Sequence, residues 1–185
     1  CRYHSKAIEN IQSPGNQEVQ DIDPLLFKKL CRELAALGTK AVELSGEGEP
    51  LVNKDLFQLI SVAKTKGLNV TVFSNATLLD SKRIESLINS QLDCLKVSLW
   101  ECTQEVYEGN YPGTDPKWFD MIIDGLNSLA LTKRKQGSSK PAVVVHHPIN
   151  RINFRTLDTL VDLGQKTGCN GISFSPLKIR RGGLT

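Results

Sequence analysis

The segment Ser45-Gly46-Glu47-Gly48-Glu49-Pro50 alternates two residue types that could do chemistry, glycine and glutamate. Glycine lets the backbone approach a ligand closely, and the carboxylate of a glutamate can pair with a positive charge on that ligand. The same order is also compatible with an ordinary turn between a strand and a helix. The two carboxylates are therefore candidate groups for a cationic ligand, and either could act as a general base in an enzyme.

The chain opens with Cys1-Arg2-Tyr3-His4, which places a thiol and an imidazole within four residues. Both groups bind metals when they are deprotonated. A structural zinc site would need a second ligand pair at metal-binding spacing. The remaining cysteines do not provide one, because they are scattered: Cys31, Cys94, Cys102 and Cys169. A terminal pair such as Cys1 and His4 is also compatible with a frayed end that binds nothing.

Positioning these groups requires regular elements, and the chain alternates helix and strand patterns. A helix is expected to start at Asp23-Pro24, an N-cap followed by proline, and to end near Gly38, with leucines at helical spacing at Leu26, Leu30, Leu34 and Leu37. Short apolar runs predict strands at 40–45, 69–74, 93–99, 142–146 and 171–175. Helices are expected near 54–66, 81–90, 117–131 and 155–166, and residues 133–140 are expected to form an exposed loop.

Strands that alternate with helices pair in parallel through right-handed crossovers, so the fold class is α/β. Periodicity alone allows a full or partial β/α barrel or an open doubly wound sheet, and both bind ligands at the carboxyl ends of the strands. Alternation places Lys96 and Ser98 on one strand face, where a buried lysine needs a partner. Adjacent His146 and His147 must lie on opposite faces, so at most one points into a cavity.

Several of these strand ends resemble those of radical S-adenosylmethionine enzymes. SGEGEP, followed by Leu51 and Asn53, is similar to the loop after the family's second strand, whose backbone groups hold the amino group of the methionine moiety. The opening residues resemble the end of the CxxxCxxC motif, with Cys1 at the second cysteine, Tyr3 at the aromatic position and His4 at the third cysteine. The first cysteine of the motif would precede the chain.

The resemblance continues in order along the chain. The run 73–79 (FSNATLL) is similar to the Thr-Asn-Gly ending of the third strand, with Ala76 in place of glycine, and 96–100 (KVSLW) to the fourth, whose serine approaches the ribose. Segments 143–153 and 171–177 resemble the fifth and sixth strand endings. The resemblance implies metal ligands at Cys1 and His4. It implies cofactor-binding residues at Tyr3, Gly46, Glu47, Gly48, Glu49, Ser74, Asn75, Ser98 and Asn150.

What the resemblance implies is a single core domain over residues 1–185, a fragment built as a partial (β/α)6 TIM-like barrel whose first strand is missing from this chain. It also implies a 4Fe-4S cluster that reductively cleaves S-adenosylmethionine to a 5′-deoxyadenosyl radical, which abstracts hydrogen from a small-molecule or peptide substrate. An external electron donor is then required. The exit after the sixth strand is similar to that of members with a C-terminal auxiliary-cluster domain of the SPASM type. No residue identifies the substrate or a catalytic side chain.

Two alternatives remain open at this stage. A degenerate barrel without a cluster could act as a binding or scaffolding domain, and His4 in the place of a cysteine is its main support. An unrelated β/α barrel enzyme could use Glu47 or Glu49 as a base, because a fold does not fix a function.

Composition narrows the classes of protein. The 185 residues suffice for one buried domain. Lys and Arg exceed Asp and Glu by only 23 to 20, which argues against a dedicated nucleic-acid surface. No apolar run is long enough to cross a bilayer, so no membrane partner is expected. Five scattered cysteines favour a reducing compartment, and we expect the protein to be cytoplasmic.

Overall fold

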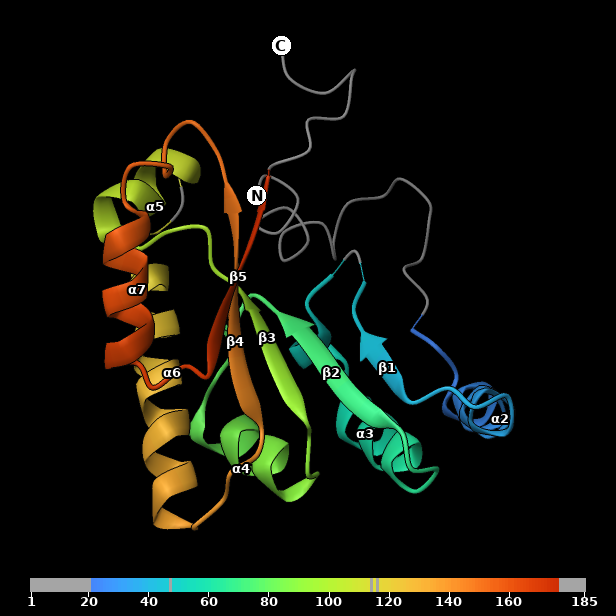
Figure 1. Ribbon diagram of the computed structural model, residues 1–185. Helices are drawn as coiled ribbons and strands as arrows, with labels where there is room; N and C mark the ends of the chain where they lie inside the picture. Colours follow the sequence, from blue (N-terminus) through green and yellow to red (C-terminus); the bar gives the residue numbers. More distant parts are fainter. Residues whose placement is uncertain (1–20, 47, 114, 116, 177–185) are drawn as a thin grey trace, which may run out of the picture.

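A computed structural model describes residues 21–46, 48–113, 115 and 117–176, and Figure 1 shows their arrangement. Five strands form one parallel sheet whose spatial order is the order along the chain. These strands are β1 (Ala41–Leu44), β2 (Asn69–Ser74), β3 (Cys94–Ser98), β4 (Ala142–Ile149) and β5 (Gly171–Pro176). A doubly wound sheet reverses its strand order at a switch point, and this sheet has no reversal. The α/β prediction is confirmed in the form of a partial barrel.

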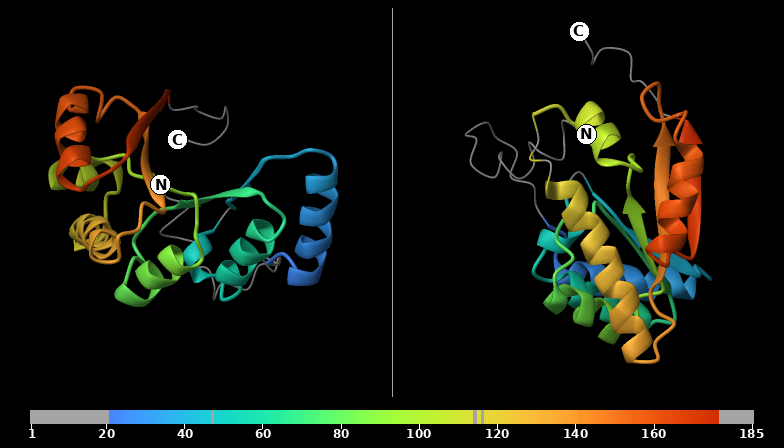
Figure 2. Two further views of the ribbon diagram at one scale, coloured as in Figure 1. Left: turned by 60° about the horizontal axis from the view of Figure 1, so that its bottom comes forward. Right: turned by 90° about the vertical axis from the view of Figure 1, so that its left-hand side faces the viewer.

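The helices of the described part follow the convex side of the curved sheet, as the left view of Figure 2 shows. No described helix covers the concave side. The helical segments are α2 (Pro24–Ala36), the 3-10 turn η2 (Pro50–Val52), α3 (Leu56–Lys64), α4 (Ser81–Asn89), α5 (Gln104–Asn110), α6 (Lys117–Lys135) and α7 (Leu157–Lys166). None of these described helices is both long and apolar enough to cross a membrane.

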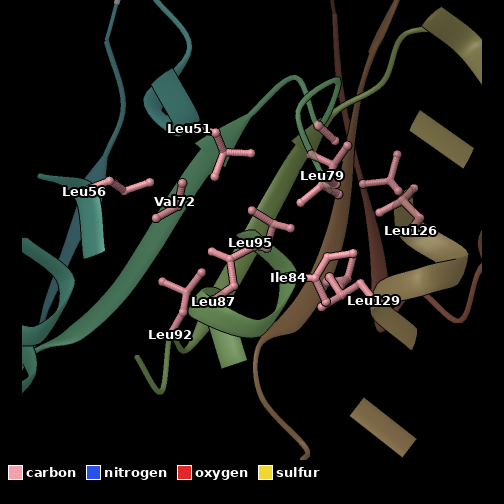
Figure 3. Packing of buried hydrophobic residues seen from close by; sticks show 14 of the residues in the cluster. Leu51, Leu56, Val72, Leu79, Ile84, Leu87, Leu92, Leu95, Leu126 and Leu129 are labelled. Atoms are coloured by element: carbon pink, nitrogen blue, oxygen red, sulfur yellow. The ribbon is translucent and has the colours of Figure 1, made fainter. Parts of the chain in front are cut away.

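The hydrophobic core lies between the convex side of the sheet and its helices. Val72 of β2 and Leu95 of β3 point to this side and are fully buried. Figure 3 shows them beside Leu87 of α4, and Leu126 and Leu129 of α6 belong to the same cluster. Burying a side chain of this size contributes roughly 1.5–3 kcal/mol. This packing fixes the strands whose carboxyl ends carry the candidate site.

Helix α2 begins where the sequence predicts, because Asp23 Oδ1 accepts a 2.8 Å hydrogen bond from the Leu26 amide. Its leucine stripe, however, is not its packed face: Leu26 is 53% exposed and Leu37 83%. The buried residues are Phe27 and Cys31. The reason is position, since α2 lies beside the edge strand β1 and packs chiefly against α3.

Two element predictions need correction. Helix α6 runs to Lys135, so the first part of the expected loop 133–140 is helical. Basic residues are favourable in a last helical turn, and Lys133 Nζ also donates to the Pro141 carbonyl oxygen at 2.6 Å. Helix α5 was not predicted, because its seven residues are too few to show a helical period.

Candidate functional site

The loop after β1 is fastened to the carboxyl end of β2 by Glu49. Its Oε1 accepts hydrogen bonds from Ser74 Oγ at 2.7 Å and from the Leu51 amide at 3.0 Å. Its Oε2 accepts one from the Asn75 amide at 2.7 Å. Burial raises the pKa of Glu49, while these hydrogen bonds and the nearby Arg83 oppose the rise. The carboxylate is therefore engaged by the protein itself, and its role in the described structure is to shape the loop.

Gly46 and Gly48 stand in this loop with their backbones open. Among the described residues, a Cβ atom at Gly48 would meet no atom within 4 Å, and one at Gly46 would meet only the Gly48 amide nitrogen, at 4.0 Å. Neither residue has the positive φ that favours glycine. Neither crowding nor φ thus requires glycine at these two positions. The described residues leave open the space that a side chain would fill at either position.

The turn after β2 is built by short polar contacts. Ser74 is only 1% exposed, and its Oγ also accepts a 2.9 Å hydrogen bond from the Ala76 amide. Asn75 Oδ1 accepts from the amide and the hydroxyl of Thr77, at 3.0 and 2.7 Å. Ala76 has a φ of 61°, the left-handed conformation that glycine adopts most easily. The position at which the resemblance implies glycine therefore has a glycine-like backbone.

Ser74 lies on the convex side of β2, in alternation with Phe73 on the concave side. In the described structure its hydroxyl donates to Glu49, and the cofactor contact that the resemblance implies for Ser74 stays a prediction. Asn75 lies just beyond the strand end and is half-buried. The structure thus brings together Gly46, Gly48 and Asn75 at neighbouring strand ends.

The concave face carries a separate polar cluster on β2 to β5, which we call the concave cluster: Phe73, Lys96, Ser98, His146 and Ser175. Lys96 Nζ lies 5.4 Å from the centre of the Phe73 ring, which meets the His146 ring edge-on at 5.5 Å. His146 Nε2 lies 3.3 Å from Ser175 Oγ. Ser98 Oγ accepts a 3.1 Å hydrogen bond from Trp100 Nε1. Burial and the nearby Lys96 charge lower the pKa of His146.

His147 lies on the opposite face of β4, as strand alternation predicts. It is fully buried, and its Nδ1 is 2.9 Å from the Leu99 carbonyl oxygen, which can only accept a hydrogen bond. Nδ1 therefore carries the proton. Burial lowers the pKa of His147, and it is a neutral core histidine.

Asn150 and Asn153 organise the loop between β4 and α7. Asn150 Oδ1 accepts from the Asn153 amide at 3.0 Å, and Asn150 Nδ2 donates to Asn110 Oδ1 at 2.9 Å. Asn153 is fully buried and donates to the Trp100 and Pro148 carbonyl oxygens at 2.8 and 2.9 Å. Asn153 thus links the segment after β3 to β4, and the predicted cofactor residue Asn150 joins the loop after β4 to α5.

Glu101 is a buried acid that the sequence analysis did not single out. It is 1% exposed, its Oε2 accepts a 3.0 Å hydrogen bond from the Trp100 amide, and its Oε1 has no hydrogen-bond partner among the described residues. Burial raises its pKa to about 8. The available signal was a carboxylate soon after a strand end, which alone does not reveal burial.

The predicted metal ligands Cys1 and His4 lie outside the described residues, as do Tyr3 and Glu47. Within the described ranges, no three His, Cys, Asp or Glu side chains come close enough to hold a metal ion. The cluster ligands remain predictions. What the described part provides is the set of strand ends beside which such a cluster would lie.

Comparison with known proteins identifies sequence relatives of this chain. No family model matches the chain. The Fe-coproporphyrin III synthase of Methanosarcina barkeri is 30% identical over 137 residues, covering 74% of this chain and 31% of that protein. The PqqA peptide cyclase of Gluconobacter oxydans is 29% identical over 104 residues, covering 56% and 27%. The chain spans about a third of the length of such relatives.

Solved structures agree in fold. Streptococcus suis SuiB bound to S-adenosylmethionine matches with a TM-score of 0.71 at 19% identity, over 90% of this chain and 37% of that one. The enzyme anSMEcpe with bound AdoMet and Kp18Cys peptide matches with a TM-score of 0.64 at 14% identity, over 100% and 49%. At such identities the likeness shows the parallel α/β barrel fold alone.

The fold and the strand-end site define a parallel β/α half-barrel of the kind found in enzymes that use S-adenosylmethionine. With the sequence relatives, this likeness places the chain in the radical S-adenosylmethionine superfamily of enzymes. The solved neighbours SuiB and anSMEcpe are both bound to S-adenosylmethionine.

Proposed function

We propose that this chain is the core barrel of a radical S-adenosylmethionine enzyme that acts on a substrate lying against the concave face of the sheet. The observation that carries the proposal is the open backbone of Gly46 and Gly48 in a loop that Glu49 fixes to β2. Glycines that the protein's own packing does not need are typical of a close ligand approach.

In this proposal the strand ends divide the work. Backbone groups of Gly46 and Gly48 hold the amino group of S-adenosylmethionine, with Glu47 as a second predicted contact. Glu49 positions the loop, because its two oxygens are already engaged by the protein. Asn75, Ser98 and Asn150 are the proposed polar contacts farther along the sheet.

The cluster is proposed to bind at Cys1 and His4, with Tyr3 beside it. When bound, the cluster and S-adenosylmethionine supply a 5′-deoxyadenosyl radical that removes hydrogen from the substrate. The protein's own residues bind and orient both molecules and keep water out. A reducing compartment such as the cytoplasm, and an external electron donor, complete the proposal.

The substrate is proposed to be a peptide or another small molecule. A peptide is supported by relatives named for peptide cyclisation, and by solved neighbours bound to the precursor peptide SuiA and to the Kp18Cys peptide. The same relatives include a Fe-coproporphyrin III synthase, which supports another small molecule as the alternative.

The first experiment is anaerobic reconstitution of the full parent chain with iron and sulfide. We expect a reduced 4Fe-4S signal in electron paramagnetic resonance that changes when S-adenosylmethionine is added. His4→Ala should lower the iron content, whereas His4→Cys should keep it. A folded parent chain that assembles no cluster would contradict the proposal and leave a barrel that binds without radical chemistry.

A second measurement tests the glycine loop itself. Gly48→Ala adds a methyl group in open space, so the fold should be kept while S-adenosylmethionine binds about tenfold more weakly, a change of about 1.4 kcal/mol. The matched control is Gly109→Ala, on the exposed side of α5, which should leave the affinity unchanged. Equal affinities for both variants would remove the loop from the site.

A further inference from the structure

Lys96 is the basic residue of the concave cluster, and it has no ion-pair partner among the described residues. Its described contact is with the Phe73 ring, 5.4 Å from Nζ. The side chain is half-buried on a face that no described helix covers. Removing an ammonium group from water is costly without a counter-charge, and contact with an aromatic ring compensates only part of that cost.

Glu43 of β1 is an acid on the same concave face, where it acts on the pKa of His146 from a distance. No ion pair joins Glu43 to Lys96 among the described residues. Glu49 and Glu101 are engaged elsewhere. Glu49 accepts a hydrogen bond from Ser74, and Glu101 accepts one from the Trp100 amide. Lys96 therefore has no directly bonded counter-charge among the described residues of the concave face.

The neighbours of Lys96 are suited to an anion with oxygen atoms. The register places Lys96 between Phe73 on β2 and Val144 on β4, with Ser98 and His146 paired in the next layer of the same face. Ser98 carries a hydroxyl, and burial and the Lys96 charge lower the pKa of His146, which favours the uncharged ring. An ammonium group flanked by a hydroxyl and an imidazole can neutralise a carboxylate and hydrogen-bond to it.

The depth of Lys96 separates this anion from the cofactor. Ser98 lies two residues nearer to the carboxyl end of β3, which corresponds to about 6.6 Å along the strand. The proposed S-adenosylmethionine site is at the strand ends themselves. A group bound by Lys96 therefore lies one layer deeper, toward the middle of the concave face.

We infer that Lys96 binds a carboxylate group of the substrate on the concave face of the sheet. The inference rests on the proposed function, because it takes the bound molecule to be the substrate of that barrel. It names the substrate class by its chemistry: a molecule with a free carboxylate that lies within reach of the proposed cofactor. Lys96 is then a specificity-determining residue, and Phe73 supports its aliphatic stem and charge.

The test uses the reconstituted parent chain with S-adenosylmethionine present and two radiolabelled probes in equilibrium dialysis. Glutarate carries carboxylates, and glutaramide is its neutral counterpart of the same shape. We expect the wild type to bind glutarate more tightly than glutaramide. Lys96→Met should weaken glutarate binding about tenfold, to the level of glutaramide, and Lys96→Arg should keep most of it. If Lys96→Met does not fold by circular dichroism, Lys96→Gln takes its place with the same expectation.

The control variant is Lys82→Met, which removes an exposed lysine on the outer helix α4 and should bind glutarate as the wild type does. Two results would overturn the inference: equal binding of glutarate by the wild type and the Lys96 variants, or a loss of S-adenosylmethionine affinity by the same factor, which would assign the carboxylate to the cofactor. The electron paramagnetic resonance spectrum of the same samples tells a failure of this inference apart from a failure of the proposed function. If the cluster signal responds normally to S-adenosylmethionine but the Lys96 variants bind glutarate as the wild type does, the inference about Lys96 is wrong and the proposed function stands.

Discussion

Ser74 Oγ donates a 2.7 Å hydrogen bond to Glu49 Oε1 and so joins the loop after β1 to the carboxyl end of β2. The other carboxylate oxygen accepts from the Asn75 amide. One side chain thereby sets the distance between two loops that come from different strands. Any ligand that contacts both loops depends on this link.

Removing the Glu49 carboxylate should destabilise the protein. In Glu49→Ala the buried Ser74 hydroxyl and the Leu51 and Asn75 amides lose their acceptor, which should lower the free energy of unfolding by about 2–3 kcal/mol. Glu49→Gln keeps one acceptor oxygen and should cost less, about 1 kcal/mol. Urea denaturation followed by circular dichroism measures both.

The control for this prediction is Glu85→Gln on the exposed surface of α4, which should change stability by less than about 0.5 kcal/mol. If Glu49→Ala were as stable as this control, the carboxylate would not hold the loop. Its position would then be free to contact a ligand directly.

The strands of this fold could be predicted from sequence because the residues that alternate along a strand also alternate between its two faces. Val70 and Val72 alternate with more polar residues, and the buried face of β2 follows from that alternation alone. The opposite orientations of His146 and His147 followed from the same rule. The packed face of α2 did not, because which of its apolar residues are covered depends on neighbouring elements rather than on spacing.

The contacts of the site could not be predicted in the same way, because they join residues far apart in the chain. Glu49 and Ser74 are 25 residues apart, and Asn153 reaches Trp100 across 53. Pattern analysis placed Glu49 in the site as a predicted cofactor contact, but it could not show that the carboxylate also accepts three hydrogen bonds from the protein, since nothing local reveals an internal acceptor. The burial of Glu101 likewise depends on the packing of several loops.

Glu101 should make stability fall as pH rises. Its pKa is raised by burial from 4.5 to about 8, so between these values the folded state holds a proton that the unfolded state has released. Folding is then favoured fully below about pH 4.5, and this contribution is lost progressively up to about pH 8. Thermal or urea unfolding at pH 5, 7 and 9 should show the decline.

The variant Glu101→Gln tests this assignment, because an amide cannot titrate. We expect it to flatten the decline and to be more stable than the wild type at pH 9 by about 1–3 kcal/mol, with little difference at pH 5. A decline of the same size in Glu101→Gln would mean that another group causes it.

Asp93 should have the opposite dependence. Although burial alone raises its pKa, hydrogen bonds from Lys140 and Lys64, at 2.5 and 2.6 Å, and from the Val70 amide lower it to about 2. This stabilisation is present above pH 3.8 and is lost as pH falls toward 2. Asp93→Asn should therefore cost about 1 kcal/mol at pH 7, after allowance for solvent screening, and remove the acid-induced loss.

Acid titration followed by tryptophan fluorescence measures this effect. Asp124→Asn, an exposed position on α6, is the matched control and should keep the acid transition of the wild type. Identical acid transitions in the wild type and in Asp93→Asn would show that the contacts of Asp93 with the two lysines do not stabilise the protein.

Helix α6 can approach the turn after β2 only because residue 125 is glycine. A Cβ at Gly125 would lie 2.7 Å from Leu79 Cβ and 3.3 Å from the Leu79 carbonyl oxygen, neither of which can move without shifting the backbone. Gly125→Ala should therefore cost about 1–3 kcal/mol, despite the better helix propensity of alanine. Gly109→Ala in α5 meets only ordinary contact, with Ile152 Cγ2 at 3.4 Å, and should stabilise by up to about 1 kcal/mol.

Because the turn that holds Asn75 leads directly into Leu79, Gly125→Ala should also weaken S-adenosylmethionine binding in the parent chain, whereas Gly109→Ala should not. If both variants had the same stability and affinity, the close approach of α6 would have no part in shaping the site.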